Sequence, residues 1–326
     1  MQILVVGAGL SGLTTAVTLL IRGHTVVVSA IDMPAVSASI IAGAIWHPFF
    51  QEPDAAYLRR AAETYSSLDK FVCDPKSGIM RRTLTEFFTT QLERLWWGSA
   101  LPYARRIGAT ELNAPYQCAY QVPVLVADTP TYLAYLNEMF LDLGGRFQKE
   151  FVQDLGNPQM SGYDVTVNCS GFGASLLCRD RTMDIVRGVV IEVEKPAHFS
   201  GCFIDDSNQY RPTYVIERAT DCILGGTAEP AQTGTHVDPS VVDDIMARCA
   251  RLAPEIANAR IKRCSVGFRP RRPTVRLGAD DSVPRLFHNY GHGGSGFTLS
   301  WGCASELATL LEQVAERPQP SDETSL

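Results

Sequence analysis

Residues 2–30, QILVVGAGLSGLTTAVTLLIRGHTVVVSA, decide the fold class of this chain. The apolar run at 2–6 is followed by a glycine turn at 7–12, and residues 13–22 then place apolar side chains at helical spacing. Gly23 is positioned to end that helix, and the HTVVVSA that follows has the composition of a second buried strand. The stretch therefore predicts a β-α-β unit and, with it, a parallel sheet.

The turn has the spacing Gly7-x-Gly9-x-x-Gly12, which suits the phosphates of a dinucleotide. The first glycine permits a tight bend, the second lets the backbone approach a pyrophosphate, and the third allows close packing of helix on strand. Leu10 and Ser11 open the helix, whose free N–H groups favour negative charge. We expect these residues to bind a cofactor.

The motif leaves the dinucleotide open between FAD and NAD. Asp32 is the acid placed to hold a ribose hydroxyl after the second strand. No Lys or Arg lies between Arg22 and Arg59, so a 2′-phosphate would lack a basic partner. NADP is therefore disfavoured.

The composition indicates a compact soluble protein. The chain has 326 residues, 45% hydrophobic and 20% charged, with a mean hydropathy of -0.01, and this length predicts about two domains. A net charge of -6 without a basic run disfavours nucleic acid and anionic membranes as partners. The apolar start has no basic flank and is broken by glycines, so we expect neither a signal peptide nor a membrane span.

Cysteine and histidine usage predicts no disulfide framework and no metal site. The nine cysteines are an odd number and form no C-x-x-C pair, and the six histidines show no metal-ligand spacing. Reduced thiols in the cytoplasm are the expected state.

The rest of the chain predicts further helices and strands. Helices are expected at 55–71, 89–97, 131–143 and 297–314. Strands are expected at 120–126, 165–169, 188–193, 209–216, 222–227 and 285–290, and those between 188 and 227 have an antiparallel pattern.

Three segments outside the first unit are candidates for chemistry. The loop 291–296 repeats the glycine spacing, but only 30 of the 326 residues follow it, too few for a second nucleotide domain. It predicts either a planar ligand such as a flavin beside a helix start, or a tight core connection. The arginines of 269–276 predict a carboxylate clamp or a solvated loop. Tyr210 and Tyr214 would share one face of an edge strand around Pro212, lining a pocket or packing as ordinary aromatics.

Together these residues resemble the D-amino-acid oxidase family of flavoproteins. The segments that carry the resemblance are VVGAGLSGL (5–13), AGAIWHP (42–48), VNCSG (167–171), YRPTY (210–214), VGFRPRRPTVRL (266–277) and HNYGHGGSGFTLSWGCA (288–304). They extend through most of the chain, and the last two are highly specific.

The resemblance implies an α/β fold with a Rossmann-like FAD-binding domain and a second α+β substrate domain built on an antiparallel or mixed sheet. The FAD-binding domain would be discontinuous, from 1–52, 128–185 and 275–326. The substrate-binding domain would comprise 53–127 and 186–274.

The resemblance also implies the reaction: FAD-dependent oxidative deamination of a D-amino acid by hydride transfer from Cα to flavin N5. The products would be the imino or 2-oxo acid, ammonia and hydrogen peroxide. The partners would be a small D-amino acid and dioxygen, and a homodimer stays open.

By matched position, the resemblance assigns residues to two sites. Arg269, Tyr214 and Tyr210 would be catalytic and would bind substrate, together with Gly294, Ser295, His47 and Ile216. The FAD site would comprise Gly7, Gly9, Leu10, Ser11, Gly12, Asp32, Ser37, Ser39, Ala44, Ile45, Phe151, Ser170, Gly293, Gly294, Gly296 and Thr298.

The chain departs from the family pattern at several positions. Ile31 stands where the family commonly has the ribose-binding aspartate, so Asp32 or another contact takes that role. His47 replaces a residue that is often an amide, and Ser295 one that is often aromatic or small. Relatives that oxidise acidic D-amino acids place an arginine after the Gly-Gly-Thr turn, where this chain has Ala228. We therefore expect a neutral substrate side chain.

Three alternatives remain. A related flavin amine oxidase acting on glycine, sarcosine or a biosynthetic amine would share the cofactor but differ in its pocket. An NAD-dependent dehydrogenase rests on the first glycine motif alone and predicts a colourless protein. A flavin-binding sensor or scaffold would be yellow but would not be bleached by amines.

Overall fold

The opening stretch folds as its sequence predicts. The computed structural model describes residues 1–31, 38–48, 54–101, 103–155 and 162–315. It begins with β1 (Gln2–Val6), α1 (Leu10–Ile21) and β2 (Thr25–Ala30), and β1 pairs with β2 in parallel. On its other side β1 pairs in parallel with β7 (Val165–Asn168). The expected β-α-β unit and parallel sheet are confirmed.

One large mixed sheet runs through the described residues. Its strand order is β4-β5-β3-β9-β10-β11-β8-β13-β14-β7-β1-β2-β6, and β12 pairs with β8 outside this path. The remaining strands are β3 (Ile79–Phe88), β4 (Arg105–Gly108), β5 (Cys118–Ala127), β6 (Arg146–Lys149), β8 (Asp184–Glu194), β9 (Cys202–Asp205), β10 (Thr213–Glu217), β11 (Asp221–Gly225), β12 (Glu229–Pro230), β13 (Ile261–Ala279) and β14 (Leu286–His292).

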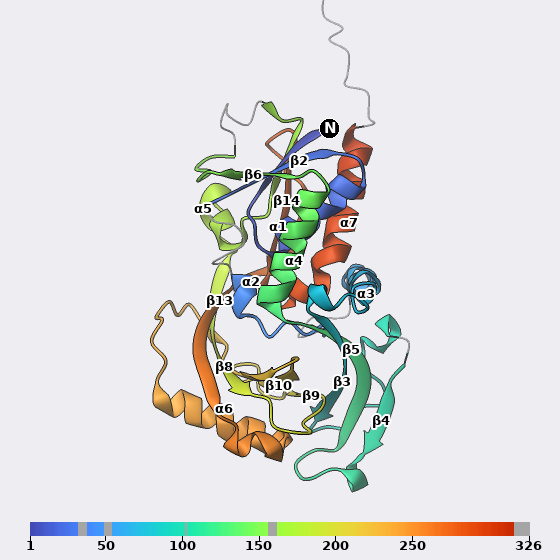
Figure 1. The fold of residues 1–326 in the computed structure, drawn as a ribbon, viewed down its shortest axis with the longest axis vertical. Helices are drawn as coiled ribbons and strands as arrows, with labels where there is room; N and C mark the ends of the chain where they lie inside the picture. The colour runs from blue at the N-terminus through green and yellow to red at the C-terminus, as the bar shows by residue number, and fades with distance from the viewer. Residues whose placement is uncertain (32–37, 49–53, 102, 156–161, 316–326) are drawn as a thin grey trace, which may run out of the picture.

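The sheet has two parts, which lie one above the other in Figure 1. The parallel part consists of β14, β7, β1, β2 and β6. In the antiparallel part, β9, β10, β11, β8 and β13 pair antiparallel, as expected for residues 188–227, and β3 joins β9 in parallel. β13 also pairs with β14, so the two parts are continuous. The domain boundaries expected from the sequence stay a prediction.

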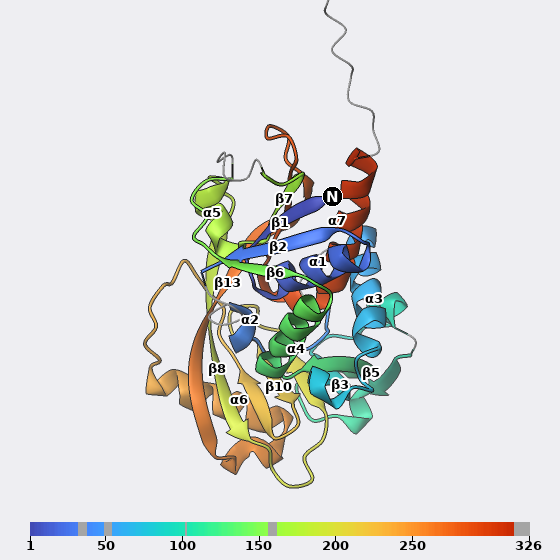
Figure 2. The same ribbon diagram turned by 45° about the horizontal axis from the view of Figure 1, so that its top comes forward.

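Helices cover both parts of the sheet. α1, α4 (Thr129–Asp142) and α7 (Gly296–Ala315) pack together beside the parallel part, and α3 (Ala55–Asp69) packs on α7 (Figures 1 and 2). α6 (Pro239–Leu252) covers the outer face of the antiparallel part, where Val189, Val215 and Leu224 are fully buried beneath it. The short helices are α2 (Ala38–Ile41), α5 (Ala174–Leu177), η1 (Pro75–Ser77), η2 (Gly98–Ala100), η3 (Ala109–Glu111), η5 (Gly171–Gly173), η6 (Pro254–Asn258) and η7 (Gly293–Ser295). In the part of the chain that the structure describes, no helix combines the length and hydropathy needed to cross a bilayer.

Aspartates begin three of the helices. Asp54, Asp128 and Asp238 accept backbone N–H groups at the starts of α3, α4 and α6. Such caps satisfy donors that the helix itself leaves unpaired. The cap at Asp128, with Pro130 in the first turn, fixes the start of α4, the helix expected at 131–143.

Two sequence predictions about secondary structure are wrong. Residues 89–97 form no helix. Leu95 and Trp97 lie in an irregular segment and are buried, so the spacing of these apolar residues reflects tertiary packing and not a helical face. The strand expected at 209–216 begins only at Thr213, so Tyr210 and Tyr214 do not lie on one strand. β10 also lies between β9 and β11, which contradicts the edge position expected from Pro212.

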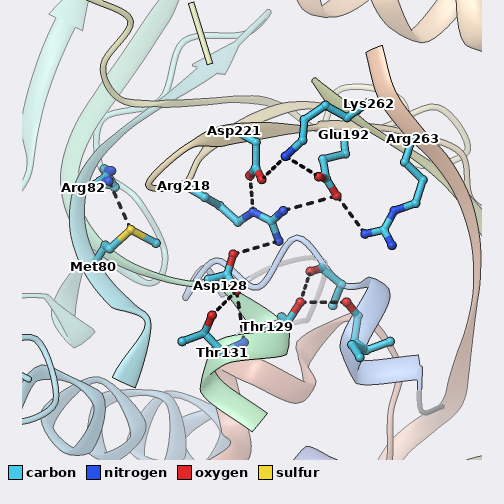
Figure 3. Close-up of polar contacts among 12 residues, drawn as sticks. Met80, Arg82, Asp128, Thr129, Thr131, Glu192, Arg218, Asp221, Lys262 and Arg263 are labelled. Carbon is cyan, nitrogen blue, oxygen red and sulfur yellow. Dashed lines mark hydrogen bonds and ion pairs between the residues drawn. The ribbon is translucent and has the colours of Figure 1, made fainter. Parts of the chain in front are cut away.

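An ion network joins the antiparallel part to the start of α4 (Figure 3). Arg218, with 6% of its side chain exposed, donates to Asp221 at 2.6 Å and lies 3.7 Å from Asp128 and 3.6 Å from Glu192. Lys262 bridges Glu192 and Asp221 at 2.8 and 3.1 Å. Separating buried Arg218 from its carboxylate partners would cost free energy of folding. The network therefore holds the β10–β11 turn against the start of α4.

Candidate active site

The turn between β1 and α1 depends on glycine at two positions. Gly7 has φ +112°, and a Cβ there would lie 2.5 Å from the Cys169 carbonyl oxygen. A Cβ on Gly12 would lie 1.9 Å from the Gly7 carbonyl oxygen. At the N-cap of α1, Gly9 offers no side chain to the free N–H groups. The N-cap residue therefore leaves backbone donors of the turn to a ligand, as phosphate binding requires.

Several other residues assigned to the cofactor surround this turn. The Leu10 N–H donates to Ser39 Oγ at 3.3 Å, and Ser11 Oγ donates to the Asn289 carbonyl at 2.8 Å. Ser170 lies beside Gly7, since its Cα would be 3.1 Å from a Cβ there. Phe151 is 62% exposed, and its assignment to the cofactor stays a prediction. Asp32 and Ser37 lie outside the described residues.

The loop 42–48 connects the two parts of the sheet. Ala44 has φ 44°, and its carbonyl accepts the Ala127 N–H at 2.9 Å. Ile45 forms a bridge with Val126, which lays the loop along β5. Thr298 Oγ1 then accepts the His47 N–H at 3.2 Å and donates to the His47 carbonyl at 3.0 Å. The loop thus holds Ala44 and Ile45 along β5 and brings His47 to Thr298 at the start of α7.

The second glycine loop leads directly into α7. Gly293 has φ +57°, Gly294 is exposed, and α7 begins at Gly296. Ser295 is 3% exposed, and its Oγ accepts the Tyr57 hydroxyl at 3.1 Å. An exposed glycine backbone at the positive end of a long helix suits a flat ligand that gains negative charge.

These features fit FAD. One helix start with bare N–H groups lies at Gly9, and a second, with an exposed glycine backbone, lies at Gly296. The contact of Ser11 with the Asn289 carbonyl ties the first helix start to β14, the strand that leads into the second. The pyrophosphate of FAD would bind at the first helix start, and its flavin ring would bind at the second.

The substrate residues meet through strand register. Arg269 pairs with Val186, and Gly188 and Val190 follow on the same face of β8. Val190 pairs with Gly225, and Gly225 with Tyr214. Because residues directly opposite one another share a face, Arg269 and Tyr214 point to the same side of the sheet.

Ile216 also lies on this inner face. Ile216 follows Tyr214 on β10 and is 3% exposed. A Cβ on Gly43 would lie 2.6 Å from the Ile216 side chain, so the loop 42–48 lies close above this face.

Glycines provide the space for both polar groups. A Cβ on Gly188 would lie 2.2 Å from Arg269 Nη1, and a Cβ on Gly225 would lie 1.9 Å from Tyr214 Cζ. The two side chains therefore lie flat over neighbouring strands and approach one another. Burial raises the pKa of Tyr214, and the Arg269 guanidinium, which bonds to its hydroxyl, opposes that rise. At neutral pH the phenol stays protonated and can donate.

Arg269 differs from the other arginines of its segment. Arg271, Arg272 and Arg276 pair with Asp184, Asp180 and Asp280 at 2.6, 2.8 and 2.8 Å. Arg269 donates to the Thr227 carbonyl at 3.1 Å, and no described residue gives it a carboxylate. It is only partly exposed, so its charge is available to an external anion. The sequence could not separate these four arginines, and the structure does.

Tyr210 is not brought into this group. It lies in the loop before β10 with 57% of its surface exposed. Its carbonyl accepts the Ala228 N–H at 2.9 Å, which places its backbone beside the end of β11. Its assignment to the substrate stays a prediction.

A buried arginine on α6 supports the substrate face from behind. Arg248, 6% exposed, donates to the Pro212 carbonyl, Thr213 Oγ1 and the Gly226 carbonyl at 2.9, 2.7 and 2.9 Å. It thereby joins the start of β10 to the end of β11, next to Tyr214. Sequence reasoning missed it, because nothing in α6 indicates what the helix covers.

A second polar cluster contains His47, which the resemblance assigns to the substrate, and two acids that sequence reasoning missed, Glu86 and Asp206. One ligand-type atom of each of His47, Glu86 and Asp206 lies within 4.8 Å of the others. His47 Nε2 is 3.2 Å from Glu86 Oε1, with both side chains less than a tenth exposed. The only sequence signals were an acid within the strand that holds Glu86 and an Asp-Asp pair before the YRPTY segment. The absence of a metal stays a prediction.

Electrostatics in this cluster are unusual. Burial acts to lower the pKa of His47, but the charge and hydrogen bond of Glu86 and the charge of Asp206 outweigh it and raise that pKa. Burial raises the pKa of Asp206 to about 7, with Glu86 and Asp205 adding to the rise and His47 opposing it. The pKa of Asp206 is therefore raised mainly because the carboxyl group is removed from water.

Comparison with known proteins agrees with this geometry. A family model described as FAD dependent oxidoreductase matches residues 2–310. A D-amino-acid oxidase from Rubrobacter xylanophilus is 37% identical over 310 residues, covering 94% of each chain. A D-amino-acid oxidase from Streptomyces coelicolor is 36% identical over 314 residues, covering 95% of this chain and 96% of that one.

A solved structure confirms the fold. Glycine oxidase from Geobacillus kaustophilus superposes with a TM-score of 0.81 at 19% identity, covering 95% of this chain and 94% of that one. The chain belongs to the FAD-dependent oxidoreductase family that the matching model describes, and it is an enzyme that uses FAD.

Proposed function

We propose that the protein oxidises D-amino acids to imino acids, which hydrolyse to 2-oxo acids and ammonia. The observation that carries this proposal is Arg269, a guanidinium with no carboxylate partner among the described residues, beside a Tyr214 hydroxyl that can donate. The name shared by the relatives from R. xylanophilus and S. coelicolor supports the class of substrate.

The two groups bind the substrate carboxylate. Arg269 offers parallel N–H donors, and the Tyr214 hydroxyl adds one more. Gly188 and Gly225 leave the space in which both side chains lie flat. A zwitterion held at its carboxylate has its α-carbon fixed in position, which supplies much of the rate enhancement.

FAD, when bound, supplies the acceptor for the electrons removed from the α-carbon. Gly7, Gly9, Gly12, Leu10 and Ser11 would hold its pyrophosphate, while Gly293, Gly294 and Gly296 would contact its ring. The start of α7 would stabilise negative charge there. Dioxygen would restore the oxidised cofactor and yield hydrogen peroxide.

The deciding experiment is an anaerobic titration of the FAD-loaded protein with matched D- and L-amino acids. We expect D-amino acids to bleach the flavin absorbance and their L-enantiomers to leave it unchanged. A yellow protein that no D-amino acid bleaches would refute the proposal. Bleaching by glycine or sarcosine alone would instead establish the related amine oxidase.

The setting of the reaction is also a proposal. All nine cysteines are free thiols, and most are buried. This state suits a reducing cytoplasm. Gel filtration of the loaded enzyme would determine whether it forms a homodimer.

A further inference from the structure

The inner face of the antiparallel part carries a second charged group beyond the carboxylate site. Tyr214 pairs with Ile204 on β9, and Ile204 pairs with Glu86 on β3. Glu86 therefore lies on the same face as Tyr214 and Arg269, two strands further along the sheet. Strands are spaced by about 4.8 Å, so Glu86 lies roughly 10 Å beyond Tyr214 at the backbone.

Asp206 lies between these two positions. It immediately follows β9, the strand between β10 and β3. It interacts electrostatically with Tyr214 on one side and with Glu86 and His47 on the other. The order across the face is therefore the carboxylate site, then Asp206, then Glu86.

His47, in the loop 42–48, is the third member of this cluster. Its backbone is bonded to Thr298 at the start of α7, where the resemblance places the flavin. Its ring packs edge-on against Trp97, with ring centroids 5.2 Å apart. The cluster thus lies between the expected cofactor position and the sheet, where the substrate would lie.

The cluster holds two carboxyl groups and one imidazole close together. Among the described residues, the carboxylates of Glu86 and Asp205 raise the pKa of Asp206 and His47 opposes that rise, after the larger effect of burial. Glu86 is 6% exposed, and its Oε2 has no hydrogen-bond partner among the described residues. Burying a carboxylate oxygen without a donor costs free energy, so this oxygen is available to a ligand group that donates a hydrogen bond, and a cationic donor suits a carboxylate best.

We propose, building on the proposed oxidase function, that Asp206 and Glu86 with His47 form a subsite for a cationic substrate side chain. The preferred substrates would be D-amino acids with a terminal amine or guanidine, of the length of ornithine, lysine or arginine. The α-carboxylate would bind Arg269 and Tyr214, and the terminal cation would bind Asp206 and the free oxygen of Glu86.

This subsite departs from the neutral side chain expected from Ala228, but it agrees with the exclusion of acidic ones. The lack of an arginine after Gly225-Gly226-Thr227 argues against acidic side chains, and carboxylates in the side-chain subsite argue against them independently. Neutral side chains would bind, but they would leave Glu86 Oε2 without a partner.

The test compares D-lysine with D-norleucine, which has an apolar chain of similar length, on the FAD-loaded enzyme. We expect kcat/KM for D-lysine to exceed that for D-norleucine at least tenfold. Asp206→Asn and Glu86→Gln should each reduce this ratio about tenfold, mainly through KM for D-lysine. The control is Asp184→Asn, which removes a carboxylate that already pairs with Arg271 and should leave the ratio unchanged.

Binding gives a second readout that does not depend on turnover. An α-methyl analogue of D-lysine has no α-hydrogen to lose, so calorimetry would measure its affinity directly. Its affinity should fall about tenfold in Asp206→Asn and stay unchanged in Asp184→Asn.

Three outcomes would overturn the subsite. Oxidation of D-norleucine as efficiently as D-lysine would refute it while leaving the proposed oxidase function intact. Stabilisation by Zn²⁺ or Mn²⁺ that requires Asp206, without a preference for D-lysine, would show a metal site instead. Failure to oxidise any D-amino acid would refute both proposals.

Discussion

In the parallel part of the sheet, the residues expected to hold the cofactor phosphates lie close together in sequence, at 7–12 after β1. In the antiparallel part, Arg269 and Tyr214 are distant in sequence and meet only through the register of β13, β8, β11 and β10. A local motif can therefore identify the first site, whereas the second requires the whole sheet. Mutations in the first site should therefore affect FAD binding, and mutations in the second should affect substrate binding.

The largest effect is expected from Gly12→Ala in the parallel part. The new Cβ would lie 1.9 Å from the Gly7 carbonyl oxygen, so α1 could not close against the turn. We expect the purified protein to lose its bound FAD, as measured by the ratio of flavin to protein absorbance. Gly108→Ala is the control, because a Cβ there meets nothing within 4 Å. Full FAD occupancy in Gly12→Ala would contradict the role of this turn.

The next largest effect is expected from Arg269→Met in the antiparallel part. Loss of a charge-assisted bidentate pair costs at least ~1.5–3 kcal/mol, so KM should rise about 10- to 100-fold. FAD occupancy should not change, which separates this variant from Gly12→Ala. Arg276→Met is the control, because Arg276 is paired with Asp280. Equal KM values in the two variants would refute the clamp.

A smaller effect is expected from Gly225→Ala, which tests the space beneath Tyr214. The added methyl group would lie 1.9 Å from Tyr214 Cζ and would displace the ring from the carboxylate site. We expect KM to rise about tenfold, equivalent to ~1.4 kcal/mol. The double variant Gly225→Ala/Tyr214→Phe should be no worse than Tyr214→Phe alone. Additive losses would show that Gly225 acts elsewhere.

The smallest effect is a pH-dependent gain in stability from Asp206→Asn without substrate. The pKa of this carboxyl rises from its ordinary value of 3.8 to about 7 in the folded protein. As pH rises between these values the unfolded chain releases the proton first, so the folded state loses stability. Asparagine removes this loss, so Tm should increase by about 2 °C near pH 8 and change little near pH 4. A lower Tm at both values would mean that the Asp206 charge stabilises the fold.

The sequence predicted the parallel part well because its determinants are local. The glycine turn, the helical periodicity and the β-branched strand all occur within residues 2–30. Asp128 and Pro130 likewise lie at the start of the helix that they begin, α4. The long helix at the C-terminal end also followed from its periodicity. In these segments, the residues that determine the conformation lie within the segment that adopts it.

The antiparallel part was less predictable because its determinants are tertiary. Nothing local shows that Arg271 and Arg276 have aspartate partners while Arg269 has none. In the sequence Tyr210 and Tyr214 are equivalent candidates for the substrate site. Only the start of β10 at Thr213 separates them, because it leaves Tyr210 outside the strand. Glu86 and Asp206 come together only because β3 pairs with β9, which no pattern in either strand indicates.

The length of β13 has a mechanical consequence. Its 19 residues would span roughly 60 Å if fully extended, and it pairs with β8 in the antiparallel part and with β14 beside the parallel part. Swinging the two parts open would require breaking these ladders, so we expect the gap between the cofactor site and Arg269 to stay nearly constant during turnover. Entry and exit of small molecules should then require no relative movement of the two parts.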